Sequence, residues 1–246
     1  MEILFIDAKY KKKDFYLSNE TIKYLKKFKI IAIYSSIQFV EGVEKIIKDL
    51  NNNGIEVTSS IPDRASVKYQ ILGCDCFKQN LKLEKNPEAF LYIGDGLFHP
   101  KALSLAQKDE LKFKEVISYD PTRKQMIILK EEEHKKIFKK YRGSLMKFIA
   151  SDNIGILITT KPGQQQFNLA KKLKEKYPKK KFYFFADNDL KFDQLENFNF
   201  IECWVNTACP RIGFDDSINL NLPLLNITDA LKCEEILGKE SLLTKS

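Results

Sequence analysis

The sequence of 246 residues has no long uninterrupted apolar stretch. A membrane-spanning helix needs ~18 or more apolar residues with few or no charges, and no part of the chain approaches that length. The first residues, Met-Glu-Ile-Leu-Phe-Ile-Asp, lack a basic region and a cleavage site, so they predict a strand and not a secretion signal. We therefore expect a cytoplasmic protein without a membrane partner.

Arginine is scarce although the chain is basic, with a formal charge of +8. Of 41 basic residues only Arg64, Arg123, Arg142 and Arg211 are arginines. Because lysine cannot replace the planar guanidinium fork, these four positions are enriched for sites where the fork matters. The lysines are spread along solvated helix faces without interleaved aromatics, so we expect no direct nucleic-acid contact. The alternative is a positive surface that steers an acidic or RNA-associated protein partner.

The five cysteines lack the spacings of common cysteine motifs. The sequence contains no CxxC pair, no CxxxCxxC run and no two-knuckle zinc pattern. A cytosolic chain also argues against a disulfide framework, which leaves metal binding, catalysis or plain burial. For Cys203 and Cys233 we favour burial, because a lone cysteine near a strand is more often a small apolar residue than a ligand.

A strand–helix–strand unit occurs twice along the chain. Residues 29–57 and 153–185 each contain an apolar strand, a hydroxyl-rich turn with glutamine, an amphipathic helix, a short turn and a second apolar strand. Near-continuous apolar strands are typical of parallel sheets that are covered on both faces. We predict two tandem Rossmann-like α/β domains with parallel sheets, at residues 1–128 and 129–246.

Each half carries a cysteine after an apolar segment that we interpret as a strand, Gln-Ile-Leu-Gly-Cys74 in the first half and Ile201 to Cys209 in the second. We expect these strands to be equivalent. Ligands of open α/β sheets bind outside the carboxyl ends of the strands. If the domains face each other, Cys74 and Cys209 can therefore meet in one cleft. Cys76 is either a further ligand through a CxC spacing or a packing residue.

A glycine-rich turn follows another predicted strand of the first half. Gly94 and Gly96 form a GxG turn, which either lets the backbone approach a ligand closely or merely reverses the chain. His99 is either a core histidine or a donor in the cleft. We predict a helix over Lys101–Gln107 after this turn.

Two residues of the second half are suited to binding a carboxylate. Gln164 lies in a Lys-Pro-Gly-Gln helix start, where backbone amides point at the ligand. Arg211 directly follows a Cys-Pro pair and offers a guanidinium fork.

Six motifs occur along the chain: Ile-Leu-Gly-Cys74-Asp, Tyr-Ile-Gly-Asp-Gly-Leu-Phe-His-Pro (92–100), Tyr-Asp-Pro (119–121), Thr-Lys-Pro-Gly-Gln (160–164), Asn-Asp-Leu (188–190) and Thr-Ala-Cys209-Pro-Arg-Ile (207–212). In this order and spacing they resemble the diphthamide synthase family over nearly the whole chain. The resemblance implies three tandem α/β domains, each of which gives one cysteine to a 4Fe-4S cluster. It also implies that the open iron binds S-adenosylmethionine, whose reductive cleavage yields a 3-amino-3-carboxypropyl radical.

In the family this group is attached to a histidine of translation elongation factor 2, which the resemblance makes the expected partner and substrate. Cys74 and Cys209 match the cluster ligands of the second and third family domains. The residues expected to line the S-adenosylmethionine or substrate cleft are Gly94, Gly96, His99, Gln164 and Arg211.

The first family domain, with its cysteine, has no counterpart in this resemblance. A partner chain, or a second copy in a homodimer, could supply the third thiolate, or Cys76 could replace it. The third explanation is a non-catalytic or differently reacting relative. We favour the first two and expect a transferase. The alternatives are an electron-relay subunit and a cluster-free module that docks the elongation factor.

Overall fold

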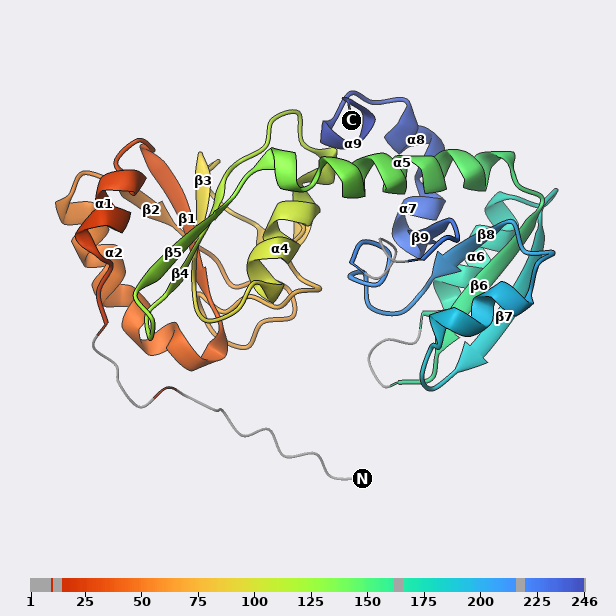
Figure 1. The fold of residues 1–246 in the computed structure, drawn as a ribbon, viewed down its shortest axis with the longest axis horizontal. Helices are drawn as coiled ribbons and strands as arrows, with labels where there is room; N and C mark the ends of the chain where they lie inside the picture. The colour runs from red at the N-terminus through yellow and green to blue at the C-terminus, as the bar shows by residue number, and fades with distance from the viewer. Residues whose placement is uncertain (1–9, 11–14, 162–165, 216–219, 246) are drawn as a thin grey trace. The chain divides into compact units, whose positions relative to one another are not determined.

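The chain forms two compact units, each with its own sheet (Figure 1). The computed structural model describes residues 10, 15–161, 166–215 and 220–245. Unit 1 comprises Met1–Gln107 and Lys112–Glu133, and unit 2 comprises Lys108–Leu111 and His134–Ser246. Lys108–Leu111 therefore packs with unit 2, although unit 1 flanks it in the sequence.

Unit 1 is an α/β unit built on a five-stranded sheet with the order β2-β1-β3-β4-β5. All neighbouring strands are parallel except the edge pair β4–β5, which is an antiparallel hairpin. Its elements are α1 (Asn19–Leu25), β1 (Ile30–Ser35), η1 (Ile37–Gly42), α2 (Val43–Asn52), β2 (Glu56–Thr58), α3 (Lys78–Leu81), β3 (Ala89–Ile93), α4 (Phe98–Leu105), η2 (Ala106–Asp109), β4 (Val116–Asp120), β5 (Gln125–Leu129) and η3 (Glu131–Glu133).

Helices cover both faces of this sheet, so its strands read as continuous apolar runs. Ile31 and Ile33 of β1 point to one face, where they join a core with α1 and α2. Ala32 and Tyr34 alternate to the other face and pack with α4. In Figure 1, α1 and α2 accordingly lie on the opposite side of the sheet from α4.

Unit 2 has a four-stranded, fully parallel sheet with the order β7-β6-β8-β9. Trp204 of β8 lies in a core on one face, while the neighbouring Cys203 points to α5 on the other. Its elements are α5 (Lys135–Ala150), β6 (Asn153–Thr159), α6 (Phe167–Lys176), β7 (Lys181–Asp187), η4 (Phe192–Asn197), β8 (Cys203–Asn206), β9 (Leu224–Asn226), α7 (Ile227–Leu231), α8 (Cys233–Leu237) and α9 (Leu242–Lys245).

The predicted α/β class with mostly parallel sheets is confirmed. Both predicted strand–helix–strand units are present, as β1-α2-β2 and β6-α6-β7. Their places in the two sheets match, because β2-β1-β3-β4 and β7-β6-β8-β9 follow one order. β3 is therefore the counterpart of β8. Within the described part of the chain, no helix is both long and apolar enough to cross a membrane.

Candidate functional site

Cys74 lies in the connection between β2 and β3, and the strand that we predicted to lead into it is absent. β2 ends at Thr58, opposite Ala32, so the carboxyl end of β1 is paired with β3 on one side and lacks a strand partner on the β2 side. The incoming loop fills this place with a single bridge between Gln70 and Ser35. The Tyr69 carbonyl accepts a hydrogen bond from the Ser35 backbone amide at 2.7 Å.

This placement corrects the expectation that Cys74 and Cys209 end equivalent strands. Cys209 follows β8, whose counterpart in unit 1 is β3, whereas Cys74 comes before β3 in the chain. The bridge to Ser35, the last residue of β1, nevertheless brings the Cys74 loop to the carboxyl end of a parallel strand. A single bridge is enough to anchor the loop at this place. In the sequence, however, the apolar residues of such a loop look the same as those of a strand, so the sequence does not distinguish the two.

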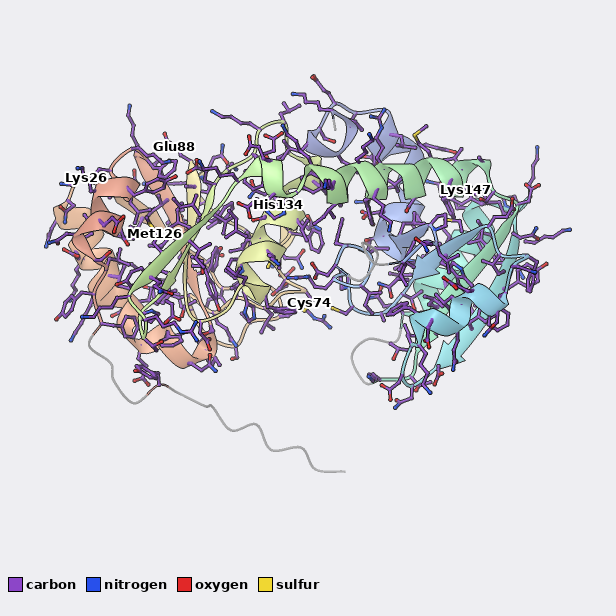
Figure 2. The ribbon with its side chains drawn as sticks, in the orientation of Figure 1. Lys26, Cys74, Glu88, Met126, His134 and Lys147 are labelled. Carbon is purple, nitrogen blue, oxygen red and sulfur yellow. The ribbon has the colours of Figure 1, made fainter. Side chains whose placement is uncertain are left out.

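The loop of Cys74, which is labelled in Figure 2, is held by the buried carboxylate of Asp75. Asp75 is fully buried and accepts hydrogen bonds from the Arg64 amide at 2.5 Å and the Asn80 side chain at 2.8 Å. The Arg64 guanidinium approaches the Cys74 sulfur at 3.4 Å through Nη1. Cys74 itself is partly exposed. The loop thus presents one accessible thiol beside the Arg64 guanidinium.

Cys76 differs from Cys74 in its surroundings. It is only 3% exposed, belongs to the core beneath α4, and donates its thiol hydrogen to the Leu72 carbonyl at 3.2 Å. In an extended chain, the side chains of Cys74 and Cys76 would point the same way. Because residues 73–75 form a turn and a bend, strand alternation does not apply. The geometry of Cys76 is that of a packed core residue.

The Gly-Asp-Gly turn lies next to the Cys74 loop. A Cβ built on Gly73 would stand 2.6 Å from the Phe98 ring, so the two segments touch. Gly96 has a φ of +66°, which favours glycine, and a Cβ on Gly94 would stand 2.6 Å from the Tyr92 hydroxyl. Both glycines are therefore required by backbone shape and close packing.

His99 lies in the first turn of α4 and not before the helix. We predicted a helix over Lys101–Gln107, but α4 begins at Phe98 and ends at Leu105. Proline is tolerated in the first turn of a helix, so Pro100 does not delay its start. The His99 ring stacks on Tyr92 with a centroid separation of 5.7 Å, and Nδ1 lies 3.2 Å from the Tyr92 hydroxyl. His99 is partly buried at the edge of the turn.

Cys209 lies three residues beyond β8 and is partly exposed, as the sequence predicted for a cysteine after a strand. Two asparagine side chains hold the backbone around it. Asn206 donates to the Cys209 carbonyl at 2.9 Å, and Asn226 donates to the Pro210 carbonyl at 2.8 Å. This loop also presents one accessible thiol outside the carboxyl end of a parallel sheet.

Arg211 is buried and ion-paired. Its Nε contacts the Asp215 carboxylate four residues on, and the residue is 8% exposed. Asp215 therefore orients the guanidinium two residues after Cys209. Gln164, the other predicted carboxylate contact, lies outside the described residues.

Cys203 and Cys233 are fully buried, in line with the packing role that we favoured. Their thiols face the carbonyls of Ser144 at 3.8 Å and Leu145 at 3.4 Å. Burial raises the pKa of Cys203 well above its usual range and that of Cys233 to about 12. Neither thiol is suited to give a thiolate ligand at neutral pH.

A cluster ligand set can be tested against these environments. Thiolates are the protein ligands of iron–sulfur clusters, and they need accessible cysteines. Cys74 and Cys209, one in each unit, fit this requirement, and the three buried cysteines do not. Among the described residues, no group of three or more His, Cys, Asp or Glu side chains could hold a metal ion. Within the described part of the chain, each unit thus offers one accessible thiol.

Sequence reasoning missed the side chains that hold the two cysteine loops. Asp75 stands inside the Cys-Asp-Cys motif and Asn206 opens the Asn-Thr-Ala-Cys motif, so their position beside a cysteine was the available signal. Arg64 was noted only for being one of few arginines, and nothing in the sequence connects it with Cys74.

The fold and these loops define a class of tandem α/β proteins with one accessible cysteine in each unit at the carboxyl end of a parallel sheet. The profile of the family described as "Putative diphthamide synthesis protein" matches residues 1–236. The chain belongs to this family.

Its relatives support the assignment at modest identity. The chain is 27% identical over 220 residues to the 2-(3-amino-3-carboxypropyl)histidine synthase of Pyrococcus horikoshii, a match that covers 85% of this chain and 60% of the relative. It is 31% identical over 201 residues to the synthase of Methanocaldococcus jannaschii, covering 80% and 49%. The Dictyostelium discoideum synthase subunit 1 is 24% identical over 241 residues, covering 95% and 49%. The chain thus spans about half to three fifths of the length of these relatives.

A solved structure is similar as well. The crystal structure of Dph2 from Pyrococcus horikoshii with a 4Fe-4S cluster aligns with a TM-score of 0.69 and 27% identity, covering 89% of this chain and 61% of that chain. The similarity in fold therefore extends over both units.

Proposed function

We propose that the chain takes part in the first step of diphthamide biosynthesis, the transfer of the 3-amino-3-carboxypropyl group from S-adenosylmethionine to a histidine of translation elongation factor 2. The observation that carries the proposal is the pair of accessible thiols, one per unit, in a chain that belongs to the diphthamide synthesis family. The synthase names of the relatives and the 4Fe-4S cluster in the Pyrococcus structure support it.

In this proposal Cys74 and Cys209 are cluster ligands. When bound, the cluster supplies the electron that cleaves a sulfur–carbon bond of S-adenosylmethionine. Arg64 stabilises the Cys74 thiolate through its N–H donor, at 3.4 Å from the sulfur. The two asparagines beside Cys209 hold its backbone in place.

The other predicted site residues are proposed to bind and orient the substrate. Arg211, oriented by Asp215, and Gln164 are proposed to contact the methionine carboxylate. Gly94 and Gly96 shape the Gly-Asp-Gly turn, and the open space at the Cβ position of Gly96 is proposed to let the backbone approach the nucleoside or amino-acid part closely. The His99 ring, held by Tyr92, is proposed to contribute to binding of the same substrate.

We further propose that the third thiolate comes from outside these two units, from a partner chain or a second copy. Cys76 is the local alternative, and its burial beneath α4 argues against it. Several relatives are named subunit 1, which supports an assembly of more than one chain.

Anaerobic reconstitution of the full chain with iron and sulfide tests the cluster. We expect the broad absorbance near 400 nm that [4Fe-4S] proteins show, roughly four irons per cluster, and the loss of both in Cys74→Ala and Cys209→Ala. Cys203→Ala is the matched control, since it removes a buried thiol and should retain iron. If both Cys74→Ala and Cys209→Ala keep the iron content of the parent, the cluster ligation is wrong.

Transfer of label from S-adenosylmethionine to elongation factor 2 with dithionite then separates the functions. Label on the factor supports the transferase. A bound cluster without transfer supports an electron-relay subunit. Binding of the factor that is unchanged in both cysteine variants and needs no iron supports a docking module.

A further inference from the structure

Two buried asparagines bind three consecutive residues of the Cys209 loop. Asn206 accepts a hydrogen bond from the Ala208 amide at 2.9 Å and donates to the Cys209 carbonyl at 2.9 Å. Asn226 donates to the Pro210 carbonyl at 2.8 Å. The two side chains bond each other at 2.8 Å, from directly paired positions on β8 and β9. They are 1% and 3% exposed.

The side chain of Asn226 is not used as its position predicts. Asn226 is the N-cap of α7, where an asparagine side chain ordinarily bonds to the first helical amides. Here it makes no capping bond. It points to Asn206 and Pro210 instead, which shows that its hydrogen bonds go to the Cys209 loop and not to its own helix.

A second set of buried groups fixes Asn226 in turn. The Tyr141 hydroxyl accepts a hydrogen bond from the backbone amide of Asn226 at 3.0 Å and donates one to the Asp229 carboxylate at 2.5 Å. Asp229 also forms an ion pair with Lys108 at 3.1 Å, and the Lys108 side chain is only 2% exposed. These contacts therefore form a continuous polar network that connects η2, α7, α5 and the end of β9.

The residues that follow Pro210 in the loop pack against the same buried groups. The Phe214 ring stacks on Tyr141 with centroids 4.3 Å apart. A Cβ on Gly213 would stand 2.5 Å from the Asn226 carboxamide oxygen, so the backbone there lies directly on that side chain. The loop is thus held before and after Pro210, and Asn226 contacts both parts.

Burying so many polar groups adds little to stability, since each must be desolvated before it is bonded. What a fully bonded buried network does provide is a single well-defined arrangement of the groups it holds. In unit 2 that arrangement is the backbone that carries Cys209.

We propose that Asn226 is a positioning residue for the Cys209 thiol, and that Asn206 and the Tyr141–Asp229–Lys108 set hold it in place. The relevance to cluster binding rests on the proposed function, whereas the effect on the thiol does not. Loss of the Asn226 carboxamide frees the loop, so the thiol samples more open conformations.

Alkylation of Cys209 in the cluster-free full chain tests the proposal, with the rate at each cysteine followed by mass spectrometry. For Asn226→Ala and Asn226→Asp we expect Cys209 to react about fivefold to tenfold faster, the effect of losing one or two hydrogen bonds on local opening. Cys74 in unit 1 is the internal standard and should keep its rate.

Ser144→Ala is the matched control. Ser144 Oγ accepts the Leu224 amide of β9 at 3.3 Å, so the variant removes another buried bond to the same strand but none to the Cys209 loop. We expect less than a twofold change in the Cys209 rate. Tyr141→Phe keeps the ring that stacks on Phe214 and removes only the hydroxyl, so it should raise the rate by a smaller factor than Asn226→Ala.

The proposal is overturned if Asn226→Ala and Asn226→Asp leave the Cys209 rate unchanged, or if Ser144→Ala raises it equally. Should both Asn226 variants fail to fold by near-ultraviolet circular dichroism, Tyr141→Phe decides in the same way. Loss of iron from reconstituted protein to a chelator gives a second measurement. Faster loss in the Asn226 variants supports a role in cluster binding, whereas full iron retention in Cys209→Ala removes that role and leaves the thiol result standing.

Discussion

At the scale of single residues, the three glycines at positions 94, 96 and 143 differ in what their lack of a side chain provides. Gly94 leaves room for the Tyr92 hydroxyl, Gly96 supplies a left-handed backbone, and Gly143 lies in α5 with open space around it. Only the first two positions depend on glycine, and these border the Cys74 loop.

Alanine substitutions should separate these roles. We expect Gly94→Ala to lower the free energy of unfolding by about 1–3 kcal/mol, since the buried Tyr92 cannot move aside. Gly96→Ala should lower it by about 1 kcal/mol through backbone strain alone. Gly143→Ala, the control, should raise it by about 0.5–1 kcal/mol, because alanine favours a helix. Urea unfolding followed by circular dichroism measures all three, and equal effects at Gly94 and Gly143 would contradict this reading.

Two buried tyrosines make unit 1 sensitive to alkaline pH. Burial raises the pKa of Tyr34 and that of Tyr92 to about 12 each, against about 10 in an unfolded chain. Between these values the folded state holds more protons than the unfolded state, so the free energy of unfolding falls as pH rises. The stabilisation is complete below about pH 10 and is lost towards pH 12.

The parent loses free energy of unfolding between pH 10 and 12, and Tyr34→Phe should reduce this loss by on the order of 2 kcal/mol. At neutral pH it should lower stability by about 1 kcal/mol, because the hydrogen bond to Ser60 is lost. Tyr16→Phe, which removes a hydroxyl at an exposed position, is the control and should keep the stability of the parent at neutral pH. Urea midpoints by circular dichroism across this pH range provide the measurement, and identical slopes for Tyr34→Phe and the parent would disprove the assignment.

At the scale of elements, the short helix η2 contributes a buried charge to unit 2. Burial opposes the charge of Lys108, but the carboxylates of Asp229 and Asp109 outweigh it and raise the pKa of the lysine. A buried ion pair of this kind adds little net stability, yet removing one partner leaves an uncompensated charge.

Lys108→Met should therefore lower the free energy of unfolding of unit 2 by about 3–5 kcal/mol. Lys108→Met combined with Asp229→Asn should recover part of this loss, since no charge is then left buried. Lys136→Met on the exposed face of α5 is the control and should change stability by less than about 0.5 kcal/mol. Trp204 fluorescence in urea reports the transition, and a double variant less stable than Lys108→Met would argue against a buried pair.

At the scale of the whole molecule, the two units have separate cores. The chain has one tryptophan, Trp204, in the core of unit 2. Its fluorescence therefore reports the unfolding of unit 2 alone, whereas circular dichroism reports both units.

Core truncations should act on one unit at a time. Leu91→Ala should lower the free energy of unfolding of unit 1 by about 3 kcal/mol. We expect this as a shift of part of the circular dichroism transition, with the Trp204 transition unchanged. Leu157→Ala in unit 2 should shift the Trp204 transition by a similar amount. A Trp204 transition that moves equally in both variants would mean that the units unfold as one.

Much of the fold and part of the site could be predicted from the sequence. The β1-α2-β2 and β6-α6-β7 units follow from apolar periodicity, which depends only on neighbouring residues. Cys209 was placed correctly because β8 is an apolar run that ends just before it. Cys74 was assigned to a strand that does not exist, because a loop anchored by one bridge at the end of β1 has the same apolar composition.

What the sequence by itself determined is thus the α/β class, the repeated unit and the two cysteines that follow apolar segments, since all of these are written in local pattern. Only the tertiary structure decided which thiols are accessible and what holds them. Lys108 stands in a polar stretch that is typical of a surface, yet it is buried against Asp229. Asn226 occupies the N-cap position of α7, yet its side chain bonds to the Cys209 loop instead of the helix. Burial and choice of partner depend on residues far apart in the chain, and no local pattern records them.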